Sequence, residues 1–342
     1  MEPAERFIGC LIGTAVGDSL LLPAEGLSRR IVARRFPGLL RQRLVFGQGM
    51  VSDDTEHTFL TAQALLAAGD DADRFAQALA QRLRWWLLSL PGGCGKATAL
   101  GLLRSWLGFP PSRSGVRSAG NGPAMRSAII GLRWAHDAAR RTAFVAASTG
   151  ITHRDPMALA AAQAVADAAA WIARQEELST LWSAWRNISA DHSWQTVVDR
   201  MENAFKNQKT VDDLATDLGC PEYVSGYALY SVPVALFAWL RHRGEAQACL
   251  SAILRCGGDT DTIGAIAGAL LGVDGGAAAF TSEWKTKIWA WPMSLTVLEE
   301  TGRNLSTPSQ HAASWCWPCQ PLRNLAFLII ILVHGFRRLA PF

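Results

Sequence analysis

Residues 257–272 read GGDTDTIGAIAGALLG, and this stretch decides how the chain folds. Ile263, Ile266 and Leu270 recur at helical spacing, which predicts a helix. Within this helix Gly264, Gly268 and Gly272 fall four residues apart. Each glycine costs a helix roughly 1 kcal/mol relative to alanine. Such a ridge is tolerable where a second backbone has to approach closely, so we expect this helix to be packed tightly against another.

A second ridge of the same kind occurs near the N-terminus. Gly9, Gly13 and Gly17 are also four apart, and they accompany an apolar helical stripe that runs from Phe7 to Val16. Acidic residues adjoin both ridges, with Asp18 after the first and two aspartates before the second. The two helices are therefore expected to cross at the centre of the molecule, with carboxylates at one end.

The rest of the chain also shows helical periodicity, for example in 75–90 and 157–172, and alternating strand-like runs are nearly absent. We predict an all-α, compact multi-helix bundle. With 342 residues, 49% of them hydrophobic and 18% charged, it can bury a large core, which excludes a disordered or fibrous protein. The net charge of +4 is modest, and the arginines of 29–43 are interpreted as a solvated face. No stable nucleic-acid complex is expected.

Two acidic clusters predict a metal site. Asp259, Asp261 and Thr262 stand at the start of the glycine-rich helix, and Ser52, Asp53 and Asp54 form a similar group about two hundred residues upstream. Crowded carboxylates repel one another unless a cation or a proton neutralises them. Oxygen ligands of this kind suit Mg²⁺, Mn²⁺ or Ca²⁺. Taken alone, the upstream cluster is better explained as a helix N-cap.

Three more segments place polar groups at helix ends. Glu25 follows the first glycine-rich helix, and Gly120-Asn121-Gly122 forms a turn that opens a helix. Backbone N–H groups at a helix start bind phosphate well, although the same turn is also common without a ligand. His153 ends the segment 148–153 before an alanine-rich helix, where a purely structural histidine is the alternative. Five such segments in one chain are not easily explained as five helix caps.

With these five segments in this order, the chain resembles the ADP-ribosylglycohydrolase family over roughly residues 5–300. The resemblance implies an all-α fold with two Mg²⁺ ions, or Mn²⁺, in a central cleft. It implies the metal ligands Ser52, Asp53, Asp54, Asp259, Asp261 and Thr262, with Ser52 in place of the more usual threonine. Glu25, Asp54 and Asp261 are implied as catalytic residues. Gly120, Asn121, Gly122 and His153 are implied to hold the diphosphate and ribose of ADP-ribose.

The implied activity is Mg²⁺-dependent hydrolysis of the glycosidic bond between ADP-ribose and an acceptor. The acceptor could be a protein, a nucleic acid or a small molecule. Relatives that act on ADP-ribosyl-arginine often carry an aspartate in a loop that here reads LPGGCGK, residues 90–96, without an acid. This difference favours a serine-linked, nucleic-acid-linked or small substrate. A hydrolase of another ribosyl compound and a non-catalytic ADP-ribose-binding protein remain as alternatives.

Residues 1–300 are expected to form the catalytic domain, and 301–342 a linker with an apolar segment. The run LAFLIIILV, 325–333, is shorter than the roughly 20 residues that span a bilayer. We expect it to dock on the core as a helix or strand, with contact to a membrane surface as the alternative. Seven scattered cysteines and no recognisable leader predict a cytoplasmic protein. The pair Cys316 and Cys319 has redox or zinc spacing but no matching second pair, so no role is assigned to it.

Overall fold

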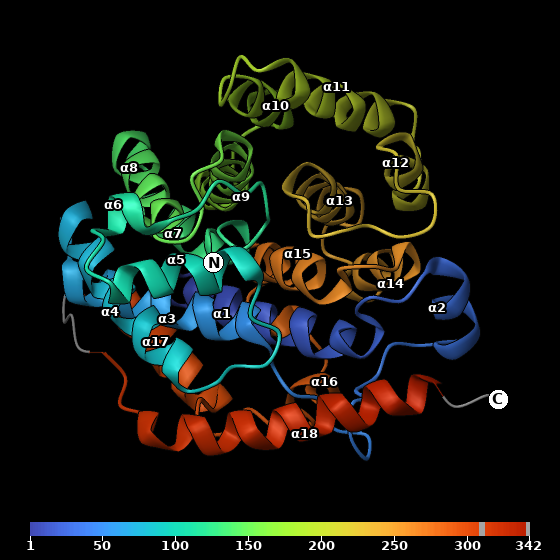
Figure 1. Cartoon of the computed structure of the whole chain (residues 1–342). Coiled ribbons are helices and arrows are strands. Elements are labelled where there is room, and N and C mark those ends of the chain that lie inside the picture. The colour runs from blue at the N-terminus through green and yellow to red at the C-terminus, as the bar shows by residue number, and fades with distance from the viewer. Residues whose placement is uncertain (308–311, 340–342) are drawn as a thin grey trace.

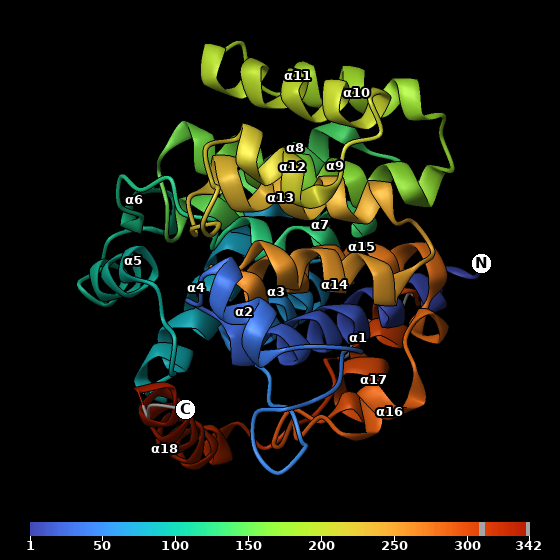
Figure 2. The same cartoon turned by 90° about the vertical axis from the view of Figure 1, so that its right-hand side faces the viewer.

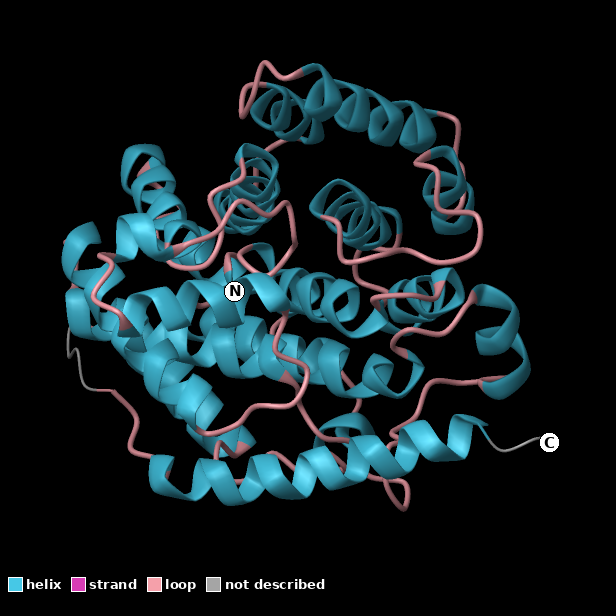
Figure 3. Ribbon diagram, viewed as in Figure 1, coloured by secondary structure: helices cyan, strands magenta, loops and turns pink. Residues whose placement is uncertain are grey.

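The computed structural model describes residues 1–307 and 312–339. This part of the chain contains eighteen α-helices and no β-strand, only isolated backbone bridges between loops (Figures 1 and 3). The prediction of an all-α, compact multi-helix bundle is confirmed. The central metal cleft stays a prediction.

The helices in the first half of the chain are α1 (Pro3–Leu21), α2 (Arg29–Arg35), α3 (Asp53–Ala68), α4 (Ala72–Leu88), α5 (Lys96–Trp106), α6 (Pro111–Ser114), α7 (Ala128–Arg133) and α8 (Ala138–Gly150). Those in the second half are α9 (Pro156–Arg174), α10 (Leu178–Arg186), α11 (His192–Lys206), α12 (Val211–Asp217), α13 (Ala228–Arg241), α14 (Ala246–Cys256), α15 (Thr260–Gly275), α16 (Ser282–Thr286), α17 (Leu295–Leu305) and α18 (Gln320–Leu339).

Helices α1 and α15 form the antiparallel centre of the bundle, and their glycines explain the contact. A Cβ atom at Gly9, Gly13 or Gly17 would overlap the carbonyl oxygen of Gly272, Gly268 or Gly264, respectively. The two ridges therefore lie against each other in register, backbone to backbone. Because the helices are antiparallel, the C-terminal end of α1 meets the N-terminal end of α15. The prediction of two crossing helices with carboxylates at one end is confirmed.

The other helices surround this pair. α3 and α17 pack against α1, and α13, α14 and α9 pack against α15 (Figures 1 and 2). Helices α10, α11 and α12 form a layer at one edge, at the top of Figure 1. This edge layer contains the fully buried indoles of Trp185 and Trp194. It therefore has a small core of its own in addition to its contacts with α9 and α13.

Two helices make up most of the described end of the chain. α17 spans Leu295–Leu305, and the apolar run belongs to α18, a helix of 20 residues that is more than twice as long as the run. A helix is one of the two forms expected for this segment. Three stretches, Pro3–Ala24, Pro156–Arg174 and Trp317–Gly335, are long and apolar enough to cross a membrane. The first two are buried inside the protein, whereas most of the third is exposed. Cys316 and Cys319, which precede α18, are joined by a disulfide.

Candidate active site

The site begins where α3 starts. Ser52 caps this helix: its Oγ accepts a hydrogen bond from the backbone N–H of Asp54 at 3.2 Å and donates one to Asp54 Oδ2 at 3.1 Å. The cap therefore exists, as the simpler interpretation of this cluster proposed. Capping does not account for the whole cluster, however, because a cap needs one side chain and here Asp53 and Asp54 follow it.

A hydrogen bond links the two acidic clusters. Thr262 Oγ1, in the first turn of α15, donates to Asp54 Oδ2 at 3.2 Å across 208 residues of sequence. Both side chains are buried. The groups 52–54 and 259–262 thus share one location, at the end of the α1–α15 pair.

Asp18, which was not selected as a site residue, holds this location together. Its Oδ2 accepts hydrogen bonds from the backbone N–H groups of Ser52 at 2.8 Å and Thr55 at 3.3 Å, and from the Thr55 hydroxyl. Burial raises the pKa of Asp18 from 3.8 to about 6, against these hydrogen bonds, which lower it. Its position at the end of the first glycine ridge, next to Gly17, was the available signal.

The carboxylates of the site raise one another's pKa values. Burial raises the pKa values of Asp53, Asp54 and Asp261 well above 3.8, and repulsion between acids adds to this. Asp53 and Asp259 raise the pKa of Asp54, while Glu25 and Asp259 raise that of Asp261. Groups that repel in this way are close together, and the site favours a bound cation or proton.

Asn121 connects the glycine-rich turn to the second cluster. Its side-chain amide donates to Asp259 Oδ2 and to Ser231 Oγ, the latter at 3.0 Å, and its backbone N–H donates to the carbonyl of Gly226 at 3.1 Å. The hydrogen bonds from Asn121 and Thr262 oppose the effect of burial, which raises the pKa of Asp259. The turn therefore borders the acidic clusters, and Ser231 is a further polar residue beside them.

His153 lies against the same turn. A Cβ atom at Gly120 would come 3.1 Å from His153 Nε2, and one at Gly122 would come 3.2 Å from His153 Cε1, so both glycines let the ring approach the backbone. Its Nδ1 is 2.9 Å from Thr152 Oγ1. Burial, assisted by the charge of Arg126, lowers the pKa of His153 to about 3, which leaves the ring neutral near pH 7.

Arg126 ties these segments into one unit. The guanidinium is fully buried and donates to Ser148 Oγ at 3.0 Å, Thr152 Oγ1 at 2.9 Å and the carbonyl of Gly122 at 3.2 Å. Nη1 also lies 3.0 Å from His57 Nδ1 on α3. Burial lowers the pKa of Arg126 to about 9, while the Asp53 charge opposes this shift. The sequence alone predicts no role for Arg126, because a buried cross-link of this kind leaves no local pattern.

Two loops form the edge of the site. Glu25 is exposed, and the next residue, Gly26, donates its N–H to the carbonyl of Gly258 at 2.7 Å. On the other edge, a Cβ atom at Gly93 would lie 3.3 Å from Asp53 Oδ1. The loop 90–96, which lacks an acid, is therefore a direct neighbour of the first cluster.

The donor atoms suit a hard cation. Oδ1 of Asp18, Asp54 and Asp261 are buried and, within the described residues, have no hydrogen-bond partner. Buried acceptors of this kind are unfavourable unless something binds to them. In the same part of the chain, no three His, Cys, Asp or Glu side chains already converge as a complete metal-binding group. The oxygen donors, together with the Ser52 and Thr262 hydroxyls, fit Mg²⁺ or Mn²⁺ in kind.

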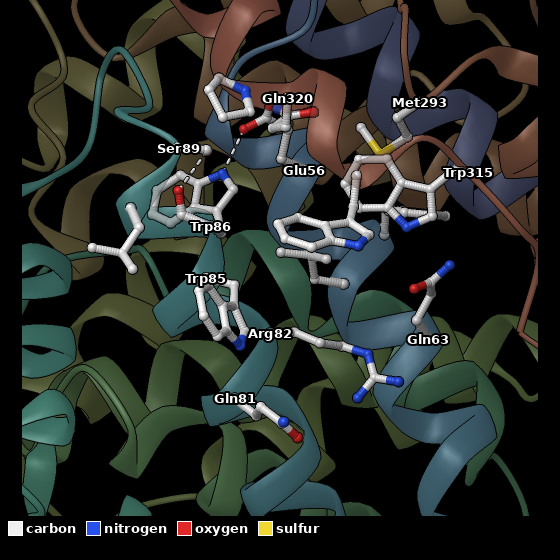
Figure 4. A pocket seen from close by; sticks show the side chains of 15 residues that line it. Glu56, Gln63, Gln81, Arg82, Trp85, Trp86, Ser89, Met293, Trp315 and Gln320 are labelled. Atoms are coloured by element: carbon white, nitrogen blue, oxygen red, sulfur yellow. Dashed lines mark hydrogen bonds between the residues drawn. The ribbon is translucent and has the colours of Figure 1, made fainter.

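A cavity of about 620 Å³ lies elsewhere, between α3, α4 and the residues before α18 (Figure 4). Its walls include the indoles of Trp85, Trp86, Trp315 and Trp317. None of the residues that line it belongs to the predicted site, although Glu56 lies on α3 only two residues after Asp54. The cavity and the acidic site therefore occupy different sides of the start of α3.

Comparison with known proteins agrees with this arrangement. The family model described as ADP-ribosylglycohydrolase matches residues 1–310. ADP-ribosyl-[dinitrogen reductase] glycohydrolase of Rhodospirillum rubrum is 25% identical, over 83% of this chain and 90% of its own length. ADP-ribosylhydrolase ARH3 of Gallus gallus is 27% identical, over 83% of this chain and 89% of its own length. An uncharacterized protein of Archaeoglobus fulgidus is 29% identical, over 79% of this chain and 88% of its own length.

A solved structure supports the same assignment at the level of the fold. An "ADP-ribosylglycohydrolase-related protein complex" superposes with a TM-score of 0.70 at 26% sequence identity, covering 90% of this chain and 99% of its own. Family membership makes the protein a hydrolase of ADP-ribosyl compounds in the general sense. Because the family model spans the chain up to residue 310 and the helical architecture agrees, this chain belongs to the ADP-ribosylglycohydrolase family.

Proposed function

We propose that the protein hydrolyses the glycosidic bond between ADP-ribose and an acceptor, with Mg²⁺ held by Ser52, Asp53, Asp54, Asp259, Asp261 and Thr262. The hydrogen bond between Thr262 and Asp54 carries this proposal, since it unites clusters that are 208 residues apart. When bound, divalent ions would orient the ribose hydroxyls and a water molecule and stabilise negative charge. Mn²⁺ suits the same oxygen donors.

The residues around the anomeric carbon then have separable tasks. In Asp54 and in Asp261 one oxygen has no hydrogen-bond partner among the described residues. These carboxylates would accept hydrogen bonds from the attacking water and take its proton. Glu25 stands at the exposed edge and would orient water or the leaving group. An oxocarbenium-like transition state gains from the negative charge that these carboxylates concentrate. The cluster thereby lowers the barrier to bond cleavage.

The glycine-rich turn would bind the rest of ADP-ribose. Gly120 and Gly122 keep this part of the backbone free of side chains, and the neutral imidazole of His153 lies against it. Asn121 bridges from this turn to Asp259, so binding of the diphosphate and ribose would be coupled to the arrangement of the acidic cluster. His153 and Asn121 would therefore affect KM more than kcat.

The acceptor would lie near the loop 90–96. Gly93 borders Asp53, and the loop has no acid to pair with a guanidinium. Its charged residue is Lys96, which is exposed. We therefore propose a serine-linked, nucleic-acid-linked or small ADP-ribosyl substrate over an arginine-linked one.

The test measures free ADP-ribose released from arginine-, serine- and nucleic-acid-linked substrates, with Mg²⁺ and with EDTA. The proposal expects metal-dependent release from at least one substrate, and a loss of about 10³-fold or more in Asp54→Asn and Asp261→Asn, because each removes a metal-binding charge. Asp199→Asn, which alters an exposed carboxylate of a surface ion pair, is the matched control and should retain activity.

Other results would change the conclusion. Full activity in EDTA, or in Asp261→Asn, would contradict the metal site. Binding of ADP-ribose in calorimetry without release from any substrate would favour a binding protein on the same fold. Preferential release from the arginine-linked substrate would show that the loop 90–96 does not exclude a guanidinium.

A further inference from the structure

Helix α18 shows a reversed distribution of polarity. A surface helix normally turns its apolar stripe to the core and its polar face to water. The exposed positions of α18 that recur at helical spacing are instead apolar: Leu322, Leu325, Leu328, Ile329, Leu332 and Val333. Between 41% and 65% of each of these side chains is accessible. The outward face of α18 is therefore more apolar than the water-exposed face of a surface helix normally is.

Polar residues hold the inward face of α18. Arg323 forms a buried ion pair with Glu56 at 3.0 Å and also donates to the carbonyl of Val51. Asn324 donates to Ser89 Oγ at 2.8 Å. Polar side chains that would face water on an ordinary surface helix thus bind to the protein, and apolar side chains of α18 face the solvent.

These bonds also determine how α18 meets its surroundings. Its length and composition would allow it to cross a bilayer. One side is nevertheless tied to α3 and to the end of α4 over its first turns, and Phe327 is buried farther along. Figures 1 and 2 show α18 lying along one side of the bundle. A helix in this position can rest on a surface but cannot pass through it.

Exposed aromatic and basic residues accompany the helix. Phe46, which is 97% accessible, is at the tip of a loop whose residues Leu44 and Met50 pack on Phe327. Trp289 is about half exposed, and its backbone N–H donates to the carbonyl of Gly49 at the base of this loop. The amphipathic indole of Trp289 is typical of the membrane–water interface, and Phe46 adds exposed apolar surface beside it.

The charge distribution is also uneven. Residues 26–51 and 301–342 contain ten arginines, of which Arg323 is paired with Glu56, and no acid, whereas the rest of the chain has 23 basic and 29 acidic residues. Arg41 is exposed in the loop beside α18, and Arg337 and Arg338 belong to its last turn. Positive charge beside an apolar helix favours anionic lipid headgroups. It disfavours a second copy of this chain, because the same basic face would meet itself.

We infer that α18 and the loop 39–49 form a docking face for an anionic membrane surface, with the outward residues of α18 entering the headgroup region. The family model ends at residue 310, so this helix lies outside the part of the chain that the family model matches. The face would hold the hydrolase at a membrane without requiring a spanning segment. Its occupant is a lipid bilayer that contains acidic headgroups.

The test is flotation of the full chain with vesicles of phosphatidylcholine alone and of phosphatidylcholine mixed with phosphatidylglycerol. Leu325→Gln/Ile329→Gln/Leu332→Gln replaces three outward apolar side chains, each of which is more than half accessible. Leu100→Gln/Leu103→Gln/Leu107→Gln is the matched control, since these three are similarly exposed on or just after α5. Thermal unfolding of each variant confirms that it is folded.

We expect the wild type and the α5 control to float with the acidic vesicles, and binding to weaken as salt is added. The α18 variant should partition at least about ten-fold less. Absence of wild-type flotation, or equal flotation of both triple variants, would overturn the inference. So would a wild-type dimer that becomes a monomer in the α18 variant without any vesicle binding, because a second copy would then cover this face.

Discussion

At the scale of single residues, the site depends on carboxylates kept where charge is unfavourable. Asp18 is the clearest case: it lies beside the proposed metal ligands, and its Oδ2 accepts hydrogen bonds from Ser52 and Thr55. Its other oxygen is buried without a partner among the described residues. Replacing Asp18 by a neutral residue should therefore stabilise the protein in the absence of metal, although it disturbs the hydrogen bonds to Ser52 and Thr55.

The pH dependence of stability tests this view in EDTA. The folded pKa of Asp18, about 6, exceeds its ordinary value of 3.8, so the native state binds the proton more tightly. The stabilisation is present below pH 3.8 and is lost as the pH rises through about 6. We expect the free energy of unfolding of Asp18→Asn, relative to the wild type, to increase by about 3 kcal/mol across this window.

Urea denaturation at a series of pH values measures this difference. Asp199→Asn, which alters an exposed carboxylate of a surface ion pair, serves as the control. A wild type that gains stability relative to Asp18→Asn as the pH rises would mean that the hydrogen bonds to Asp18 outweigh its burial.

At the scale of elements, the α1–α15 contact places every other part of the site. The glycine ridges bring the two backbones together, and Thr260 Oγ1 in α15 donates to the carbonyl of Leu21 in α1 at 2.9 Å. The acidic residues at both helix ends thereby reach α3. A change in the distance between α1 and α15 would therefore shift the C-terminal end of α1 and the N-terminal ends of α15 and α3.

Two glycine substitutions separate this packing role from helix propensity. At Gly268 a Cβ atom would collide with the Gly13 carbonyl, so Gly268→Ala should destabilise the protein by about 3 kcal/mol or more. Gly335 in α18 has open space around it, so Gly335→Ala should be neutral or stabilising by up to about 1 kcal/mol. Chemical denaturation measures both, and an equal response in the two variants would contradict the close contact.

At the scale of the whole molecule, α18 joins the docking face to the acidic site. Arg323 reaches Glu56, two residues after Asp54, and Val51, one residue before Ser52. Glu56 also accepts from Gln320 at 2.6 Å and from the Trp86 indole at 2.5 Å, a contact shown in Figure 4. The inner face of α18 thus supports the start of α3 from behind.

Breaking this connection should affect the whole protein. Arg323→Met leaves the buried Glu56 carboxylate without its cation and should cost about 3–5 kcal/mol in the free energy of unfolding. Glu56→Gln/Arg323→Met removes both charges and should recover a large part of that loss. Arg140→Met, which breaks an exposed pair with Asp70, should change stability by less than about 1 kcal/mol.

These three variants are compared by urea denaturation, with tryptophan fluorescence as the readout of unfolding. If Arg323→Met behaves like Arg140→Met, the ion pair contributes little to holding α18. The link between the docking face and the start of α3 would then rest on the other contacts of α18.

The sequence by itself determined the helical class and the central helix pair, and it brought two acidic clusters forward as the candidate site. Glycines spaced by four residues can be read locally, because only a close backbone approach tolerates them. Acids at the starts of α3 and α15 are likewise local features, and the structure brings Ser52, Asp54 and Thr262 together as expected.

Only the tertiary structure decided which groups support that site and which face of α18 is exposed. The roles of Asp18 and Arg126 arise from hydrogen bonds to residues distant in sequence, which no local pattern encodes. The run 325–333 predicts an apolar segment but not its orientation. Its outward apolar face results from Arg323 and Asn324 finding partners on α3 and at the end of α4, and that pairing exists only once the chain has folded.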